Sequence, residues 1–299
     1  MSLIAVVLGS AAGGGFPQWN CCCPVCRLAW AGDPRVKPRT QASLAVSADG
    51  EQWLLINASP DLRAQISATP ALHPKADRRA SPIAAVILTG AEIDQTAGLL
   101  TLRERQPLRL LATAAAHGFV AGNPMFSALQ ADLVPRLAVV PGERFAPLPG
   151  IEAELFAVPG KVPLYLEGDR SNEDEAGVNV GVEVRAGRAR LVYVPGAASA
   201  PATVQDRLAR ADVVLFDGTL YRDDEMILTG TGEKTGRRMG HMPIDGPDGT
   251  LATLTRLSGR RLLIHINNTN PVLIEGSPER AHVAAAGWEV AEDGMEIAL

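Results

Sequence analysis

Short apolar runs recur along the whole chain and are separated by turns rich in glycine and proline. Such runs, bounded by turn residues and rich in valine, isoleucine and leucine, are typical of buried β-strands. The pattern predicts strands at residues 3–8, 44–46, 53–56, 83–88, 108–111, 155–158, 181–184, 190–194, 213–216, 262–266, 288–290 and 295–297.

Helices are expected between these runs, at residues 60–68, 97–105, 203–210, 250–257 and 278–286. Ser59 and Ser277 precede the first and the last of them, each followed by proline, and serine at the N-cap with proline in the first turn is a helix start signal. Strands and helices occur in both halves without a linker between them. We therefore expect one domain over residues 1–299, with two sheets stacked face to face and helices outside. The acidic, aperiodic residues 167–175 are expected to form a mobile loop.

The charge of the chain argues against a nucleic-acid-binding surface. The 299 residues carry a formal net charge of −5, and the arginines are scattered, as where Arg103 and Arg105 flank Glu104. Neutralising phosphates requires clustered lysine and arginine. No apolar stretch approaches the roughly 18 residues of a membrane span, and the N-terminus lacks the basic start of a signal peptide. The expected location is the cytoplasm.

All four cysteines lie within residues 21–26, which is too narrow a spacing for disulfides that close long loops. Cys21-x-Cys23-x-x-Cys26 places three thiols on one tight loop, the kind of ligand set that a structural Zn²⁺ takes. The fourth ligand is left open between a histidine, a carboxylate, a water and Cys22. An iron–sulfur cluster, a redox thiol and incidental thiols remain alternatives. A loop stiffened by metal is also a candidate contact for a homodimer.

A glycine-rich run, residues 9–15, follows the first expected strand. Glycine loops after strands sometimes cradle phosphate, but here no lysine with serine or threonine follows and no helix opens. A tight turn that brings backbone close to the active site is the favoured interpretation.

Two carboxylates follow the buried strand at residues 83–88, within the run Thr-Gly-Ala-Glu-Ile-Asp-Gln-Thr-Ala-Gly-Leu. This run resembles the metallo-β-lactamase signature, Thr-His-x-His-x-Asp-His-x-x-Gly-Leu. On that alignment the four metal-binding positions carry Gly90, Glu92, Asp94 and Gln95, so only the aspartate is retained. The alternative is a solvated acidic turn.

Later segments extend the resemblance. Their order and spacing are similar to those of the ribonuclease Z and phosphodiesterase branch of the superfamily. Together with residues 9–21, they resemble more narrowly the pyrroloquinoline quinone biosynthesis B family, over essentially the whole chain. The segments are Asn-Ala-Ser-Pro-Asp61, Tyr-Val-Pro-Gly196, Leu-Phe-Asp217, Met-Gly-His241, His265-Ile-Asn-Asn-Thr-Asn-Pro271 and Asp-Gly-Met295.

The resemblance implies a four-layer αββα sandwich and an active-site metal held by Glu92, Asp94, Gln95 and His265. Without it, His265 at a strand end would be an ordinary buried histidine. Asn268, three residues after His265, occupies a position where the phosphodiesterase relatives place a zinc-binding histidine, although an amide is a poor zinc ligand.

Two further residues are expected to take part in catalysis. His241, in a loop flanked by glycine, has either an acid–base role or a structural hydrogen bond. Asp217 either ligates the metal or caps the next turn.

A histidine with two carboxylates suits iron or manganese, whereas zinc hydrolases use more imidazoles. We therefore expect Fe²⁺ or another divalent metal at the active site, beside the structural Zn²⁺. The family resemblance implies an iron- and O₂-dependent hydroxylase that acts on the tyrosine ring of a cross-linked Glu–Tyr intermediate in pyrroloquinoline quinone biosynthesis. Its substrate would be a small peptide-derived or quinone-precursor molecule. A carrier or transport protein for the quinone and a metal-dependent phosphodiesterase-like hydrolase are the alternatives, although Gly90 and Gly196 remove two ligands from a dizinc site.

Overall fold

The computed structural model describes residues 2–75, 78–161 and 177–299, and the acidic stretch expected to be a loop, residues 167–175, lies outside them. The described chain forms two seven-stranded sheets. None of its helices is long and apolar enough to cross a membrane.

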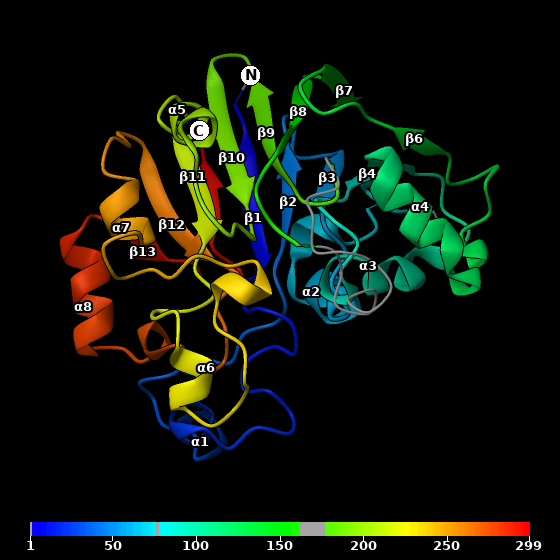
Figure 1. Cartoon of the computed structure of the whole chain (residues 1–299). Helices are drawn as coiled ribbons and strands as arrows, with labels where there is room; N and C mark the ends of the chain where they lie inside the picture. Colours follow the sequence, from blue (N-terminus) through cyan, green and yellow to red (C-terminus); the bar gives the residue numbers. More distant parts are fainter. Residues whose placement is uncertain (1, 76–77, 162–176) are drawn as a thin grey trace.

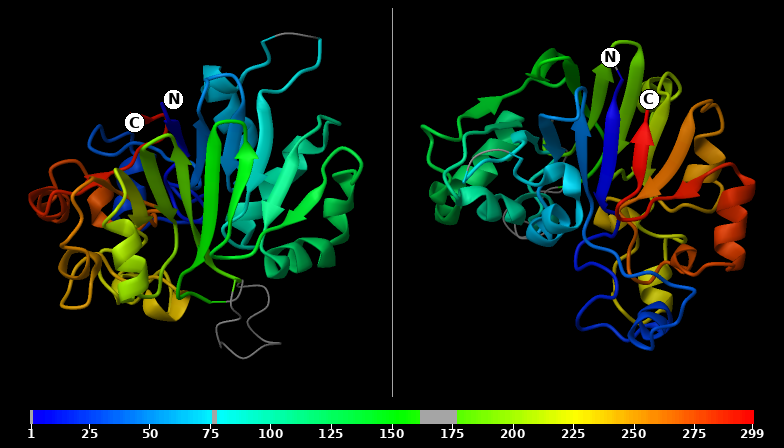
Figure 2. Two further views of the ribbon diagram at one scale, coloured as in Figure 1. Left: turned by 90° about the horizontal axis from the view of Figure 1, so that it is seen from above. Right: turned by 180° about the vertical axis from the view of Figure 1, so that it is seen from behind.

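The first sheet has the strand order β14-β1-β2-β3-β4-β5-β6. Strands β3 to β6 run parallel to one another, whereas β14, β1, β2 and β3 pair antiparallel. In Figure 2 the C-terminal strand β14 lies beside β1, so the two ends of the chain meet in one sheet. The strands are β1 (Ile4–Gly9), β2 (Ser43–Ser47), β3 (Trp53–Ile56), β4 (Ile83–Ile87), β5 (Arg109–Ala112), β6 (Arg136–Ala138) and β14 (Glu296–Ala298).

The second sheet has the order β13-β12-β11-β10-β9-β8-β7. Strands β10 to β13 are parallel and β7 to β10 are antiparallel. The strands are β7 (Arg144–Leu148), β8 (Ile151–Ala157), β9 (Val180–Ala186), β10 (Ala189–Val194), β11 (Val213–Asp217), β12 (Arg260–Ile264) and β13 (Glu289–Val290).

Three apolar clusters hold the layers together. The central cluster joins the inner faces of both sheets, which lie face to face (Figure 2). A second cluster packs the outer face of the first sheet against α2 (Leu62–Ala68) and α4 (Ala114–Gly122). The third packs β10 to β12 against α5 (Ala202–Leu208) and α8 (Pro278–Ala285). Because each sheet buries both faces where helices cover it, the result is the expected four-layer αββα sandwich.

The parallel strands end at the same edge of the sandwich, and the connections at this edge contain the short helices α1 (Pro24–Trp30), α3 (Ile93–Thr96) and α6 (Glu225–Leu228). In Figure 1, α1 and α6 lie together below the strands. Side chains that follow β4, β10, β11 and β12 are brought together here, as is usual at the carboxyl ends of strands in α/β proteins.

Several elements of the structure differ from the sequence prediction, among them helix α6, which was not expected. Strands β6 and β7 were not expected; they lie at sheet edges, and β7 contains Pro147, which an edge strand tolerates. Helices α1 and α4 were also not expected, and the sequence of α4 contains two glycines. Helix α3 begins at Ile93, earlier than predicted, and continues as a 3-10 helix. Asp61, not Ser59, is the N-cap residue of α2, and it makes no side-chain cap.

Arg207 ties α5 to the outer face of the second sheet. On neighbouring strands, Glu154 and Glu183 are direct partners in register, which places two buried carboxylates side by side. The guanidinium of Arg207 donates to both, at 2.6 Å each, and lies over the ring of Phe156. Burial alone would raise the pKa of Glu183, but Arg185 and Arg207 outweigh it and lower that pKa.

We expect Arg207→Gln to lower the free energy of unfolding by about 2 kcal/mol at neutral pH, because it removes the cation that two facing, buried carboxylates share, although Arg185 still pairs with Glu183. The lowered pKa of Glu183 means that its contribution is present at neutral pH and lost as the pH falls through that pKa. The difference from wild type should therefore shrink in acid, as measured by urea unfolding across pH. Arg63→Gln, at an exposed position, is the control. A difference that is absent at neutral pH, or constant down to acid pH, would contradict this assignment.

Candidate functional site

A pocket of about 280 Å³ opens at the carboxyl edge of the strands. Its wall is formed by the glycine-rich loop after β1, the turn after β4, the end of β10, and the loops that carry His241 and His265. A Cβ added at Gly13 would lie 3.9 Å from Asp94, so the glycine-rich loop does bring backbone close to the pocket. The tight-turn interpretation of this loop is consistent with that placement.

His265 directly follows β12 and has a left-handed backbone conformation, with φ of 59°. Such a conformation is uncommon for a residue with a side chain and costs about 1–3 kcal/mol unless its surroundings hold it. The ring is held from both sides: Nε2 lies 2.8 Å from Asp94 Oδ2, and Nδ1 lies 2.8 Å from Thr219 Oγ1. The structure thus brings Asp94 and His265 together as predicted.

The electrostatics of this pair favour the ionised forms of both groups. Burial alone would raise the pKa of Asp94 and lower that of His265. The hydrogen bond and the opposite charge outweigh burial in each case, so the pKa of Asp94 is lowered and that of His265 is raised.

Asp217 and His241 form a second pair beside the first. Asp217, at the end of β11, is fully buried and accepts hydrogen bonds from the backbone N–H groups of Ala197 and Thr219. His241 Nδ1 lies 2.8 Å from Asp217 Oδ2. The His241 ring stacks on that of His265, with centroids 5.2 Å apart and planes 19° apart. Each pair thus combines one carboxylate with one imidazole.

Thr219 joins the two pairs. Its hydroxyl lies 2.7 Å from Asp217 Oδ1, 3.0 Å from His241 Nδ1 and 2.8 Å from His265 Nδ1. A hydroxyl donates one hydrogen bond and accepts two, so this position fixes all three side chains at once. The sequence analysis did not single out Thr219; its place two residues after a strand-end aspartate was the available signal.

Asp217, His241 and His265 can hold a metal ion. Each offers one ligand atom, and these atoms lie within 4.8 Å of one another. Two imidazoles and one carboxylate form a suitable donor set for a divalent cation. Asp217 and His241, expected to assist catalysis, therefore lie within the possible ligand group itself, and Asp94 contacts that group through His265.

Glu92 and Gln95 line the same pocket, but their side chains form the N-cap of α3. The Glu92 side chain accepts a hydrogen bond from the backbone N–H of Gln95, and Gln95 Oε1 accepts one from the backbone N–H of Glu92 at 3.2 Å. A Cβ added at Gly90 would lie 2.4 Å from Gln95 Oε1. The glutamine amide thus occupies the space of a side chain at position 90. Neither Glu92 nor Gln95 belongs to the group of possible metal ligands that contains the two histidines.

A second cluster combines Cys21, Cys23 and Cys26 at the start of α1, with sulfur atoms within 4.8 Å of one another. Cys22 is exposed and is not part of it. The amide of Asn268 closes the fourth side: its Nδ2 lies 3.1 Å from Cys21 Sγ, 3.3 Å from Cys26 Sγ and 3.8 Å from Cys23 Sγ.

Burial raises the pKa of the Cys26 thiol to about 12 and also raises that of Cys23. Crowded, buried thiolates are unfavourable by themselves, and a cation in their midst would reverse this preference. The donor set therefore fits a thiophilic metal such as Zn²⁺. The position of Asn268, three residues after His265, was a usable sequence signal for the fourth side of this cluster.

Comparisons with known proteins agree with this architecture. Residues 52–266 match the β-lactamase superfamily domain family. The chain therefore belongs to the metallo-β-lactamase superfamily. It is 57% identical over 297 residues to the coenzyme PQQ synthesis protein B of Methylobacterium sp. (strain 4-46), covering 99% of each chain. The protein of the same name from Ruegeria pomeroyi is 53% identical, covering 98% of this chain and 99% of its own. Within the superfamily, the chain belongs to the coenzyme PQQ synthesis protein B family.

Solved structures give the same result. The crystal structure of Zn²⁺-bound PqqB from Methylobacterium extorquens superimposes with a TM-score of 0.96 at 53% identity, covering 98% of this chain and 99% of that chain. A diphosphatase from the PhnP family superimposes over all of this chain and 98% of its own with a TM-score of 0.70 at 20% identity, which shows the shared fold alone.

Gly90 and Gln95 should be energetically coupled. We expect Gly90→Ala to displace the glutamine amide and lower the free energy of unfolding by about 1 kcal/mol, the usual value of a helix cap. Gln95→Ala should cost a similar amount, because it removes the same cap. The double variant should then cost little more than either single variant, leaving a coupling energy of about 1 kcal/mol in a urea-unfolding cycle. Strictly additive costs would contradict the contact.

The thiol cluster should hold zinc. We expect the purified protein to contain one Zn²⁺ that is lost in Cys26→Ser, with a lower melting temperature, because a structural zinc contributes directly to folding. Cys22→Ser is the matched control, since it removes a neighbouring thiol that lies outside the cluster and should retain the metal. Elemental analysis and thermal unfolding measure both effects. Equal zinc loss in the two variants would contradict the assignment.

Proposed function

We propose that this chain acts in the synthesis of coenzyme PQQ as an iron- and O₂-dependent hydroxylase of the tyrosine ring in a cross-linked Glu–Tyr intermediate. The observation that carries the proposal is the group of Asp217, His241 and His265, of which the two histidines line the 280 Å³ pocket. Two histidines and one carboxylate are the donor set of non-haem iron oxygenases, which leaves positions open for O₂ and substrate. Membership in the coenzyme PQQ synthesis protein B family supports the pathway.

The reaction has a defined balance. Bound iron would supply the activation of O₂, one oxygen atom would enter a ring C–H bond, and the other would leave as water. Two electrons and two protons are needed for that water, so the proposal includes an external reductant.

The protein's own residues would bind and orient the reactants. Asp94 and Thr219 hold the ring of His265 from its two sides, so the imidazole is already oriented, and one ring nitrogen would release its proton and its hydrogen bond when a cation binds. Lys161 and Lys234 line the same pocket and bring positive charge near the carboxylates of a Glu-derived substrate.

A dizinc hydrolase is disfavoured by what fills the two positions that lack ligands. The amide of Gln95 occupies the space next to Gly90. A Cβ added at Gly196 would lie 3.3 Å from His241 Cε1, so the imidazole fills the space next to that glycine. Neighbouring side chains therefore replace two of the side chains that a second metal would need.

We expect anaerobically reconstituted protein to bind one Fe²⁺ in addition to the zinc of the thiol cluster. His265→Ala and His241→Ala should weaken iron binding at least about 100-fold, since each removes a direct ligand and even outer partners are worth 10–100-fold. Both variants should also abolish iron-dependent O₂ uptake with a tyrosine-containing substrate. His73→Ala, at an exposed histidine, is the control.

Elemental analysis after gel filtration and an oxygen electrode provide the two readouts. Iron-dependent hydroxylation that persists in the His265→Ala and His241→Ala variants would overturn the proposed site. Zinc-dependent phosphodiester cleavage by wild type, without iron-dependent O₂ uptake, would overturn the proposed reaction.

A further inference from the structure

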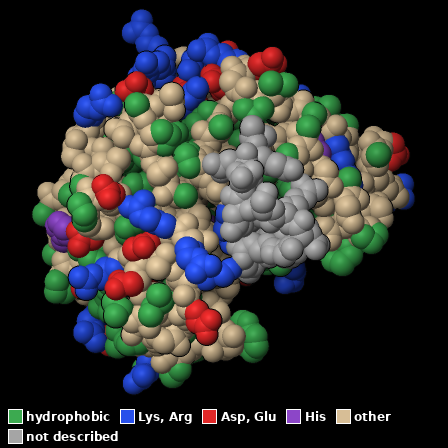
Figure 3. Space-filling model, in the orientation of Figure 1, with side chains coloured by type: hydrophobic (Ala, Val, Ile, Leu, Met, Phe, Trp, Pro, Cys, Tyr) green, Lys and Arg blue, Asp and Glu red, His purple; other side chains and the backbone are tan. Residues whose placement is uncertain are grey.

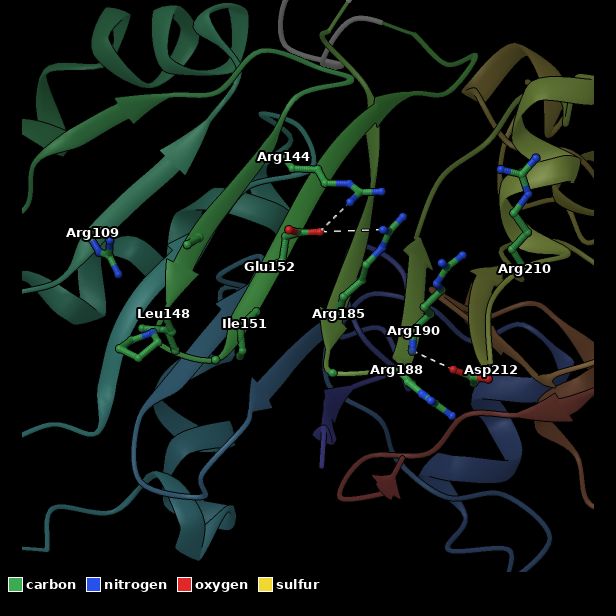
Figure 4. Close-up of a pocket in the computed structure, with 14 residues that line it drawn as sticks. Arg109, Arg144, Leu148, Ile151, Glu152, Arg185, Arg188, Arg190, Arg210 and Asp212 are labelled. Atoms are coloured by element: carbon green, nitrogen blue, oxygen red, sulfur yellow. Dashed lines mark hydrogen bonds and ion pairs between the residues drawn. The ribbon is translucent and has the colours of Figure 1, made fainter. Parts of the chain in front are cut away.

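An open groove of about 1050 Å³ lies on the second sheet, at the opposite end of the strands from the pocket. Its walls come from β7 to β10 and from the loop before β11, as Figure 4 shows. The lining of the groove is rich in arginine and includes Arg144, Arg185, Arg188, Arg190 and Arg210.

The groove and the pocket lie at opposite ends of the same strands. The groove contains the end of β9 and the start of β10, whereas the pocket contains Gly196, just after β10, and Asp217 at the end of β11 lies against it. At about 3.3 Å per residue, the six residues of β10 span about 20 Å. A ligand in the groove would therefore not contact the reacting atoms, and the groove is suited to docking.

The strand register explains why positive charge accumulates here. Val184 and Leu191 face the central core, so Arg185 and Arg190 face outward. These two arginines are direct partners across the antiparallel pair of β9 and β10. Like charges in that arrangement are destabilising. By contrast, the facing pair of Glu154 and Glu183 on β8 and β9 is neutralised by Arg207 from α5.

Acidic residues compensate only part of this charge. Arg185 lies 2.6 Å from Glu183 and 3.8 Å from Glu152, and Glu152 also pairs with Arg144 at 3.3 Å. The dashed lines in Figure 4 mark the two contacts of Glu152.

The guanidiniums of three further arginines in the groove are not neutralised in this way. Among the described residues, those of Arg188, Arg190 and Arg210 have no hydrogen-bond or ion-pair partner. The nearby carboxylate of Asp212 accepts from the backbone N–H of Arg190 at 2.8 Å, not from its side chain. In Figure 3, Lys and Arg side chains gather at the end of the molecule where the β9–β10 turn lies. A local excess of cations on a chain of net charge −5 calls for an anionic partner.

The spacing of the charges identifies the partner. The three unpaired guanidiniums come from the β9–β10 turn, from β10 and from the loop before β11, and neighbouring strands lie about 4.8 Å apart, so the charges are spread more widely than one phosphate or carboxylate group. Guanidinium forks bind carboxylates in bidentate geometry. Leu148 and Ile151 add apolar surface along the groove.

We propose that this groove docks a carboxylate-rich polypeptide segment. The segment binds in extended form along the groove, its acidic side chains paired with Arg188 in the β9–β10 turn, Arg190 on β10 and Arg210 before β11. The docking site is independent of the chemistry proposed for the pocket and stands or falls separately.

The test uses a fluorescently labelled hexaglutamate peptide and anisotropy titrations of the full chain at two salt concentrations. Wild type should bind the peptide, with weaker binding at higher salt. The triple variant Arg188→Gln, Arg190→Gln, Arg210→Gln should bind at least about tenfold more weakly, since three exposed charge pairs at about 0.5 kcal/mol each amount to about 1.5 kcal/mol and a tenfold change corresponds to about 1.4 kcal/mol. The triple variant Arg63→Gln, Arg105→Gln, Arg222→Gln changes net charge equally at exposed positions outside the groove and should bind within about twofold of wild type.

Three results would overturn the proposal: no hexaglutamate binding by wild type, equal binding of hexaglutamine, or equal weakening in the two triple variants. Single-stranded DNA that binds as tightly as hexaglutamate would overturn it as well, by assigning the groove to phosphate. Thermal unfolding checks the folded state of each variant. Arg188→Gln alone, in an exposed turn, should weaken binding in the same direction and provides the test if the triple variant is unstable.

Discussion

Two buried carboxylates at the carboxyl edge of the strands determine the chemistry of this molecule. Asp217 is fully buried and Asp94 is largely so, and an ionised carboxylate in such a place is unstable unless cations and hydrogen-bond donors surround it. Two imidazoles and one threonine hydroxyl meet this requirement here, with each carboxylate within 2.8 Å of one histidine. The same balance of charge makes the group a suitable site for a divalent cation.

The departures from the superfamily's metal motif are spatially coordinated. Gln95 fills the space beside Gly90, because the glutamine amide lies where a side chain at position 90 would extend. Gly196 and His241 are related in the same way. Each lost ligand is thus accompanied by a neighbour that fills the vacated space and keeps the wall of the pocket closed. What remains is one compact donor group, which is consistent with a mononuclear site and not with a dizinc one.

The local sequence pattern predicted most of the fold because a buried strand is visible in the sequence as a short apolar run. The run at residues 53–56 coincides with β3, and Ser277 caps α8 as expected. Edge strands lack that signal, since β6 has an exposed half and β7 contains a proline. The capping box of α3 was readable as a glutamate followed three residues later by a glutamine, yet the resemblance to metal ligands directed attention elsewhere.

The candidate site, like the fold, could be predicted from the sequence only in part. The motif resemblance located Asp94, Asp217, His241 and His265, but their grouping depends on how β4, β11 and β12 are placed in space. Thr219 and the arginine groove depend on tertiary contacts even more strongly. The arginines of the groove are dispersed over residues 109–210, and only the β9–β10 hairpin places Arg185 opposite Arg190.

Crystals of the protein loaded anaerobically with Fe²⁺, measured at the iron absorption edge, would locate the metal among these side chains. We expect one anomalous peak within bonding distance, about 2.0–2.2 Å, of both imidazoles and of a carboxylate oxygen. Iron found only at the thiol cluster, or a peak bound by Glu92 and Gln95 without His241, would contradict this expectation.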